Sequence, residues 1–157
     1  KKIYENRPIE KLRSKRLSVS EKERLLTLLP SGFSIEFENM NYSQIENHFK
    51  LLLKNFRYDN DHLDYLNTFP EEIFRFTIQN KIGNCLSYSQ LFSAILNLNG
   101  FYSFVATNNH HYEQNLGFLN KGHAFVLTFD PELKVFKKIE LALFDLRVTT
   151  FSILPIN

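Results

Sequence analysis

The stretch KIGNCLSYSQLFSAILNLNG, residues 81–100, contains a helix start, a buried helical face and a helix stop in one continuous segment. Asn84 is a favourable helix N-cap, and Gly100 is a natural C-terminal stop. Between them the apolar residues recur at helical spacing and predict a helix over 85–98 with a broad buried face. Cys85, the one cysteine of the chain, falls in the first turn of this helix. Free backbone N–H groups and the helix dipole favour a thiolate there.

The sequence before this helix is predominantly helical in pattern. Capping boxes at Ser20–Glu23 and Ser43–Glu46 predict two helix starts, and Pro70 followed by acids predicts a third. The alternation of Phe33, Ile35 and Phe37 with polar residues predicts a strand. In order, the expected segments are a helix over 20–29, a strand over 33–37, a helix over about 43–56 and a helix over 68–80.

The sequence after residue 100 changes to a strand-like pattern. The expected strands are 101–107, 122–129, a segment ending at 139–146, and 148–154. Helices followed by strands predict an α+β fold in which a central nucleophile helix packs on an antiparallel sheet. The long polar loop over 108–121 precedes the second strand, and we expect it to border a substrate cleft.

The composition predicts one globular domain over residues 1–157. The chain has 19 Lys and Arg against 17 Asp and Glu, a net charge of +2, which argues against nucleic acid as a partner. Residues 1–19 form a basic N-terminal arm that we expect to be solvated. The sequence has no apolar run long enough to span a membrane. A single cysteine excludes an internal disulfide and a multi-cysteine metal site.

The same features leave the location of the protein open. A lone free cysteine fits a reducing compartment such as the cytoplasm. The chain begins with Lys1 rather than Met, so we expect a processed or trimmed fragment, and a removed targeting segment or secretion stays possible. The oligomeric state is not predicted.

Two further residues combine with Cys85 to suggest catalysis. His123 starts a predicted strand, and Asp145 ends another, largely apolar one, where a carboxylate needs a partner. A hairpin with His123 opposite Asp145, connected by residues 130–138, would pair them. Glu140 is the rival acid, but strand alternation in this register places it on the opposite face.

The order of these motifs resembles the transglutaminase-like, papain-like-fold cysteine enzymes. That family has a helix opening with Gly-x-Cys-x-x-Tyr-(Ala/Ser), then a strand with His-Ala-aromatic-Val and a strand carrying Asp. The matching segments here are Asn55-Phe56-Arg57-Tyr58, Gly83-Asn84-Cys85-Leu86-Ser87-Tyr88-Ser89, Leu91-Phe92-Ser93-Ala94-Ile95-Leu96, Gly100, His123-Ala124-Phe125-Val126 and Phe144-Asp145. Phe125 and Leu146 stand where many members have Trp and Pro, so the resemblance does not define the subfamily.

The resemblance implies a Cys-His-Asp triad that acts on protein amide or peptide bonds through a thioester acyl-enzyme. Cys85 would attack the carbonyl, His123 would protonate the leaving amine and Asp145 would orient the imidazole. The Cys85 N–H would bind the oxyanion, with Gln79 or Asn84 as the candidate second donor. Peptide hydrolysis, glutamine deamidation and crosslinking all fit this chemistry, with a protein or peptide as substrate and no cofactor.

Several alternatives stay open at this stage. A catalytically idle transglutaminase-like module that binds proteins is the main one, and nucleic-acid binding through the basic arm is another. A metal site at His110, His111, Glu113 and His123 is not expected, because adjacent loop histidines rarely converge on one ion. His48 and His62 are expected to be structural or exposed.

Overall fold

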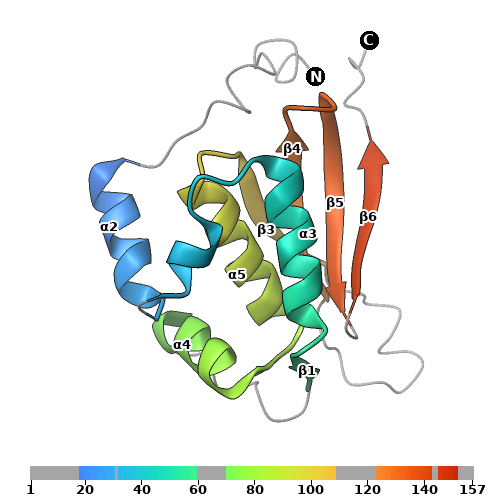
Figure 1. Ribbon diagram of the computed structural model, residues 1–157. Helices are drawn as coiled ribbons and strands as arrows, with labels where there is room; N and C mark the ends of the chain where they lie inside the picture. The colour runs from blue at the N-terminus through green and yellow to red at the C-terminus, as the bar shows by residue number, and fades with distance from the viewer. Residues whose placement is uncertain (1–17, 31, 60–69, 109–122, 143–144, 152–157) are drawn as a thin grey trace, which may run out of the picture.

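The computed structural model describes residues 18–30, 32–59, 70–108, 123–142 and 145–151. These residues form an α+β fold in which the helices lie on one side of a four-stranded antiparallel sheet (Figure 1). The helical elements are α2 (Val19–Leu28), the 3₁₀ turn η1 (Ser34–Phe37), α3 (Tyr42–Leu53), α4 (Pro70–Asn80) and α5 (Cys85–Leu98). The strand order in the sheet is β3 (Ser103–Asn108), β4 (His123–Asp130), β5 (Val135–Ala142) and β6 (Asp145–Phe151).

The central helix confirms the sequence prediction. α5 begins at Cys85, ends at Leu98 and is capped by Asn84. Its Phe92, Ile95 and Leu96 side chains are fully buried in the core that α5 shares with α3 and the sheet. Gly100 has a φ of 84°, a left-handed conformation that favours glycine, and it turns the chain from α5 into β3.

Two N-terminal predictions are wrong in detail. The first helix is capped by Ser18 with Glu21, and α3 by Asn41 with Gln44, each two residues before the predicted box. Both boxes contain a capping residue followed three positions later by Glu or Gln, so overlapping sequence signals compete. In each case the earlier residue is the one that caps the helix.

The strand predicted over 33–37 is instead the 3₁₀ turn η1. Phe33 and Phe37 are buried and their ring centroids lie 5.4 Å apart, whereas Ile35 is 64% exposed. In a flat strand all three would share one face. Core packing of the two phenylalanines therefore overrides the alternating pattern.

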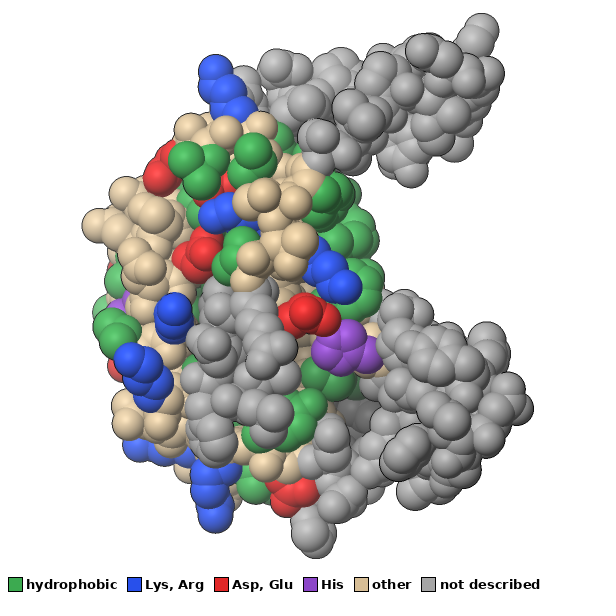
Figure 2. All heavy atoms as spheres, turned by 90° about the vertical axis from the view of Figure 1, so that its right-hand side faces the viewer, with side chains coloured by type: hydrophobic (Ala, Val, Ile, Leu, Met, Phe, Trp, Pro, Cys, Tyr) green, Lys and Arg blue, Asp and Glu red, His purple; other side chains and the backbone are tan. Residues whose placement is uncertain are grey.

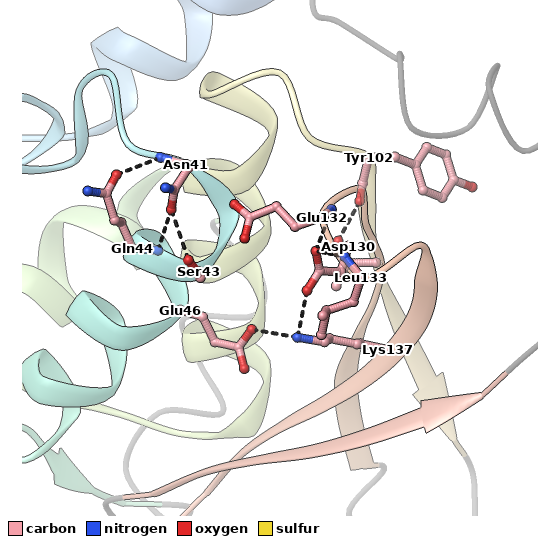
Figure 3. Close-up of polar contacts among 10 residues, drawn as sticks. Asn41, Ser43, Gln44, Glu46, Tyr102, Asp130, Glu132, Leu133 and Lys137 are labelled. Carbon is pink, nitrogen blue, oxygen red and sulfur yellow. Dashed lines mark hydrogen bonds and ion pairs between the residues drawn. The ribbon is translucent and has the colours of Figure 1, made fainter.

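The β4–β5 hairpin is tied to α3 by a buried charge cluster. Lys137 Nζ lies 2.9 Å from Asp130 Oδ2 and 3.1 Å from Glu46 Oε2 (Figure 3). The Asp130 side chain is only 2% exposed and also accepts hydrogen bonds from the Glu132 and Leu133 backbone N–H groups. Burial alone lowers the pKa of Lys137, but hydrogen bonds to the two carboxylates outweigh it and raise the pKa. The cluster therefore holds α3 against β5.

Within the described residues, no helix is both long and apolar enough to cross a bilayer.

Candidate functional site

The N-terminus of α5 is fixed by a reciprocal capping box. Asn84 Oδ1 accepts hydrogen bonds from the backbone N–H groups of Leu86 at 3.1 Å and Ser87 at 3.0 Å. In return, the Asn84 N–H donates to Ser87 Oγ at 2.9 Å. Cys85 lies between these groups with 8% of its surface exposed. The local sequence therefore places the thiol in the first helical turn, as predicted.

The backbone N–H of Cys85 has a partner that the sequence gave no reason to expect. It donates to the phenolic oxygen of Tyr58 at 3.3 Å. Tyr58 belongs to the two-residue strand β1 (Arg57–Tyr58), which pairs in parallel with β2 (Ile82–Gly83) just before Cys85. Only the tertiary pairing of these two short strands brings Tyr58 to the helix start.

Gly83 allows this arrangement because the first turn of α5 packs directly on its backbone. A Cβ atom at Gly83 would lie 2.5 Å from Ser87 Oγ and 2.5 Å from the Tyr88 ring. Such contacts are too close for any other residue unless the Ser87 and Tyr88 side chains shift. The glycine of the Gly-x-Cys motif is thus explained by close packing around the nucleophile.

His123 forms the second part of the candidate site, with a partner different from the predicted one. Its Nε2 lies 2.8 Å from Glu140 Oε1, and both side chains are about one-third exposed. Lys138 Nζ lies 3.8 Å from the same Glu140 oxygen and 4.6 Å from the centre of the Phe125 ring. Figure 2 views the molecule from the side of β5 and β6, where a histidine and an acidic side chain lie together at the surface.

The predicted register of the hairpin is wrong, and with it the exclusion of Glu140. β4 pairs with β5 through Val126–Ile139 and Asp130–Val135, and β5 ends at Ala142. Asp145 begins β6, opposite Ala142, so it is not on the strand next to His123. The register differs from the predicted one by three positions, an odd number, so Glu140 lies opposite Phe125 and on the same face as His123. The position of Asp145, opposite Ala142, is on that face too but one strand farther away. The side chain of Asp145 lies outside the described part, and its role stays a prediction.

The topology brings Cys85 and His123 to the same end of the fold. The 14 residues of α5 rise about 21 Å along the helix. After the Gly100 turn, the six residues of β3 return about 20 Å. His123 pairs with Asn108, the last residue of β3, so it lies near the level at which α5 starts.

The Cys85 thiol and the His123 imidazole are not paired in the structure. Among the described residues there is no hydrogen bond between Cys85 and His123. Ala124, Val126 and Thr128 are buried on the helix side of β4, whereas His123 shares the other face with Phe125. The described structure therefore brings Cys85 and His123 to one end of the fold, with His123 on the sheet face away from α5.

The two predicted oxyanion donors have different places in the structure. Asn84 is 5% exposed, and its side-chain oxygen is engaged as the helix cap. Gln79 lies exposed in the last turn of α4, and the described contacts do not bring it to Cys85. The 108–121 loop, with His110, His111 and Glu113, falls almost wholly outside the described residues, as does His62. His48 packs edge-on against Phe37, in agreement with its expected structural role.

Comparison with known proteins identifies a distant structural likeness. No family model matches the chain, and no curated protein matches it in sequence. One similar crystal structure is that of a protein from Cytophaga hutchinsonii with a provisional cysteine-protease assignment. The TM-score is 0.43 with 12% sequence identity, over 92% of this chain and 62% of that one. This chain therefore spans less than two-thirds of that protein.

Proposed function

We propose that this protein is a thiol enzyme in which Cys85 transfers acyl groups from protein amide or peptide bonds. The proposal is supported by the place of Cys85 in the capped first turn of α5 and by the His123–Glu140 pair, 2.8 Å apart, at the same end of the sheet although on its other face. A nucleophile at a helix start, a base and an acid that orients the base are the three parts that thiol acyl transfer needs. The distant transglutaminase-like sequence pattern agrees with this assignment.

In the proposed reaction, the Cys85 thiolate attacks the carbonyl carbon and forms a C–S bond. His123 then gives a proton to the leaving amine as the C–N bond breaks, which leaves a thioester. Because Glu140 engages Nε2, Nδ1 is the nitrogen that would exchange a proton with the thiol. Water or a second amine resolves the thioester, giving hydrolysis, deamidation or crosslinking.

The proposal is tested by alkylation of Cys85 with iodoacetamide, followed by intact mass. In the native protein we expect fast labelling, because His123 stabilises the thiolate. His123→Ala should slow labelling about tenfold or more, whereas His48→Ala, a change of a histidine far from the site in sequence, should not. Labelling that is slow in the native protein and becomes fast only in denaturant would contradict the proposal.

A catalytically idle binding module is the second candidate function. It is favoured by the burial of Cys85 and by the absence of a Cys85–His123 hydrogen bond among the described residues. Under this alternative Cys85 is a small core residue. Its labelling would then follow unfolding of the protein and would not depend on His123.

A pair of acid substitutions separates the two candidates for the orienting residue. Glu140→Gln should lower turnover of p-nitrophenyl acetate about 10²-fold or more, because the amide no longer stabilises the imidazolium. Asp145→Asn, the matched change on β6, should leave turnover within about twofold. Initial rates of p-nitrophenolate release measure both. A large loss in Asp145→Asn with none in Glu140→Gln would restore Asp145 to the triad.

A further inference from the structure

Among the described residues, the side-chain hydroxyl that accepts a hydrogen bond from the backbone N–H of Cys85 is that of Tyr58. The Cys85 N–H donates to Tyr58 Oη at 3.3 Å. In acyl transfer by Cys85, this same N–H points to where negative charge develops on the attacked carbonyl oxygen. Tyr58 Oη therefore lies beside the oxyanion position of the proposed reaction.

The backbone of Tyr58 is held firmly in this place. The Arg57 N–H donates to the Lys81 carbonyl at 2.7 Å, and the Asp59 N–H donates to the Gly83 carbonyl at 2.9 Å. These two bonds flank Tyr58 on both sides. The phenol is thus carried by a strand whose register is set against the residues that lead directly into Cys85.

The Tyr58 ring is also braced by a second tyrosine. Its centroid lies 6.3 Å from that of Tyr88, and the Tyr88 hydroxyl donates a hydrogen bond to the Arg57 carbonyl. Burial raises the pKa of Tyr88, so its hydroxyl keeps the proton that it donates. The Tyr88 ring packs in turn against Gly83. These contacts hold the phenol of Tyr58 in one position beside the Cys85 N–H.

We infer that Tyr58 is the second donor of the oxyanion hole, in place of Gln79 or Asn84. This rests on the proposed function of Cys85. A substrate carbonyl oxygen would take over the Cys85 N–H hydrogen bond that Tyr58 Oη accepts in this structure, and the phenol O–H would then donate to the same carbonyl oxygen. As the C–S bond forms, the carbonyl π electrons move to that oxygen, and the two donors stabilise its charge. When the tetrahedral intermediate collapses, the charge leaves with the leaving group.

The experiment compares two reactions of the same sulfur in Tyr58→Phe. Acylation by p-nitrophenyl acetate passes through an oxyanion, forms a C–S bond and releases p-nitrophenolate. Alkylation by iodoacetamide displaces iodide from a saturated carbon and forms no oxyanion. We expect acylation to fall about 10²-fold or more, while the alkylation rate stays within about twofold. Tyr102→Phe, which removes one phenolic oxygen just before β3, at the end of the fold away from Cys85, should leave both rates within about twofold.

Each other outcome overturns the inference for an identifiable reason. Equal loss in both reactions would mean that Tyr58 only supports the thiol or the fold, which a thermal melt of Tyr58→Phe also measures. Unchanged or faster acylation would mean that the phenol does not donate to the oxyanion. If the native protein itself forms no thioester with the ester, the proposed function fails, and the inference falls with it.

Discussion

Cys85→Ala is expected to abolish formation of the thioester with p-nitrophenyl acetate and to lower turnover about 10³-fold or more. Loss of the nucleophile removes the covalent route altogether, and such losses are the largest that single substitutions cause in triad enzymes. Intact mass measures the thioester, and p-nitrophenolate release measures turnover. The fold should survive, because only one heavy atom is removed and the expected cost is of order 1 kcal/mol.

Ser89→Ala is the matched control for this variant. Ser89 is fully buried in the same helix, and its Oγ has no hydrogen-bond partner in the described part of the chain. The substitution therefore also removes one buried heavy atom from α5. Full activity in Ser89→Ala with none in Cys85→Ala would assign the loss to the thiol. Full activity in both would remove Cys85 from the reaction.

Lys137→Met is expected to give the largest loss of stability, about 3–5 kcal/mol in the free energy of unfolding. It leaves the buried carboxylate of Asp130 without its cation, and an unpaired buried charge is costly. It also removes the ion pair with Glu46 and the contact of Nζ, 4.9 Å from the centre of the Tyr42 ring. Urea denaturation measures the change.

Lys138→Met, at the next position of β5, is the control for Lys137. Lys138 is 38% exposed and its ion pair with Glu140 spans 3.8 Å, so we expect a loss of at most about 1 kcal/mol. Adding Asp130→Asn to Lys137→Met should recover part of the stability, because it removes the stranded charge. Equal losses in the two lysine variants would show that burial of the cluster contributes nothing.

The pH dependence of the Lys137 contribution follows from the direction of its pKa shift. The pKa is raised in the folded state, so the stabilisation is fully present below the unfolded value of 10.5. It is lost only as the pH rises through the higher folded value. At neutral pH Lys137 therefore stabilises the fold fully, and we expect the Lys137→Met variant to show the whole loss of stability there.

The helix that carries Cys85 could be predicted from local sequence alone. Asn84 and Gly100 act through contacts within a few residues of their own positions, so local chemistry suffices to place both ends. The glycine at 83 could also be read from the motif, although its reason, the close approach of Ser87 and Tyr88, is visible only in the fold.

The residues that contact Cys85 and His123 could not be predicted in this way, because they come from distant parts of the chain. Tyr58 reaches the Cys85 N–H through pairing of β1 with β2, and no local pattern encodes a contact between residues 27 positions apart. The partner of His123 depends on the register of β4 and β5, where the hydrophobic alternation fits more than one alignment of the strands. The alignment that the structure adopts places Glu140 on the face of His123 and within 2.8 Å of it, and it moves Asp145 to the next strand, β6.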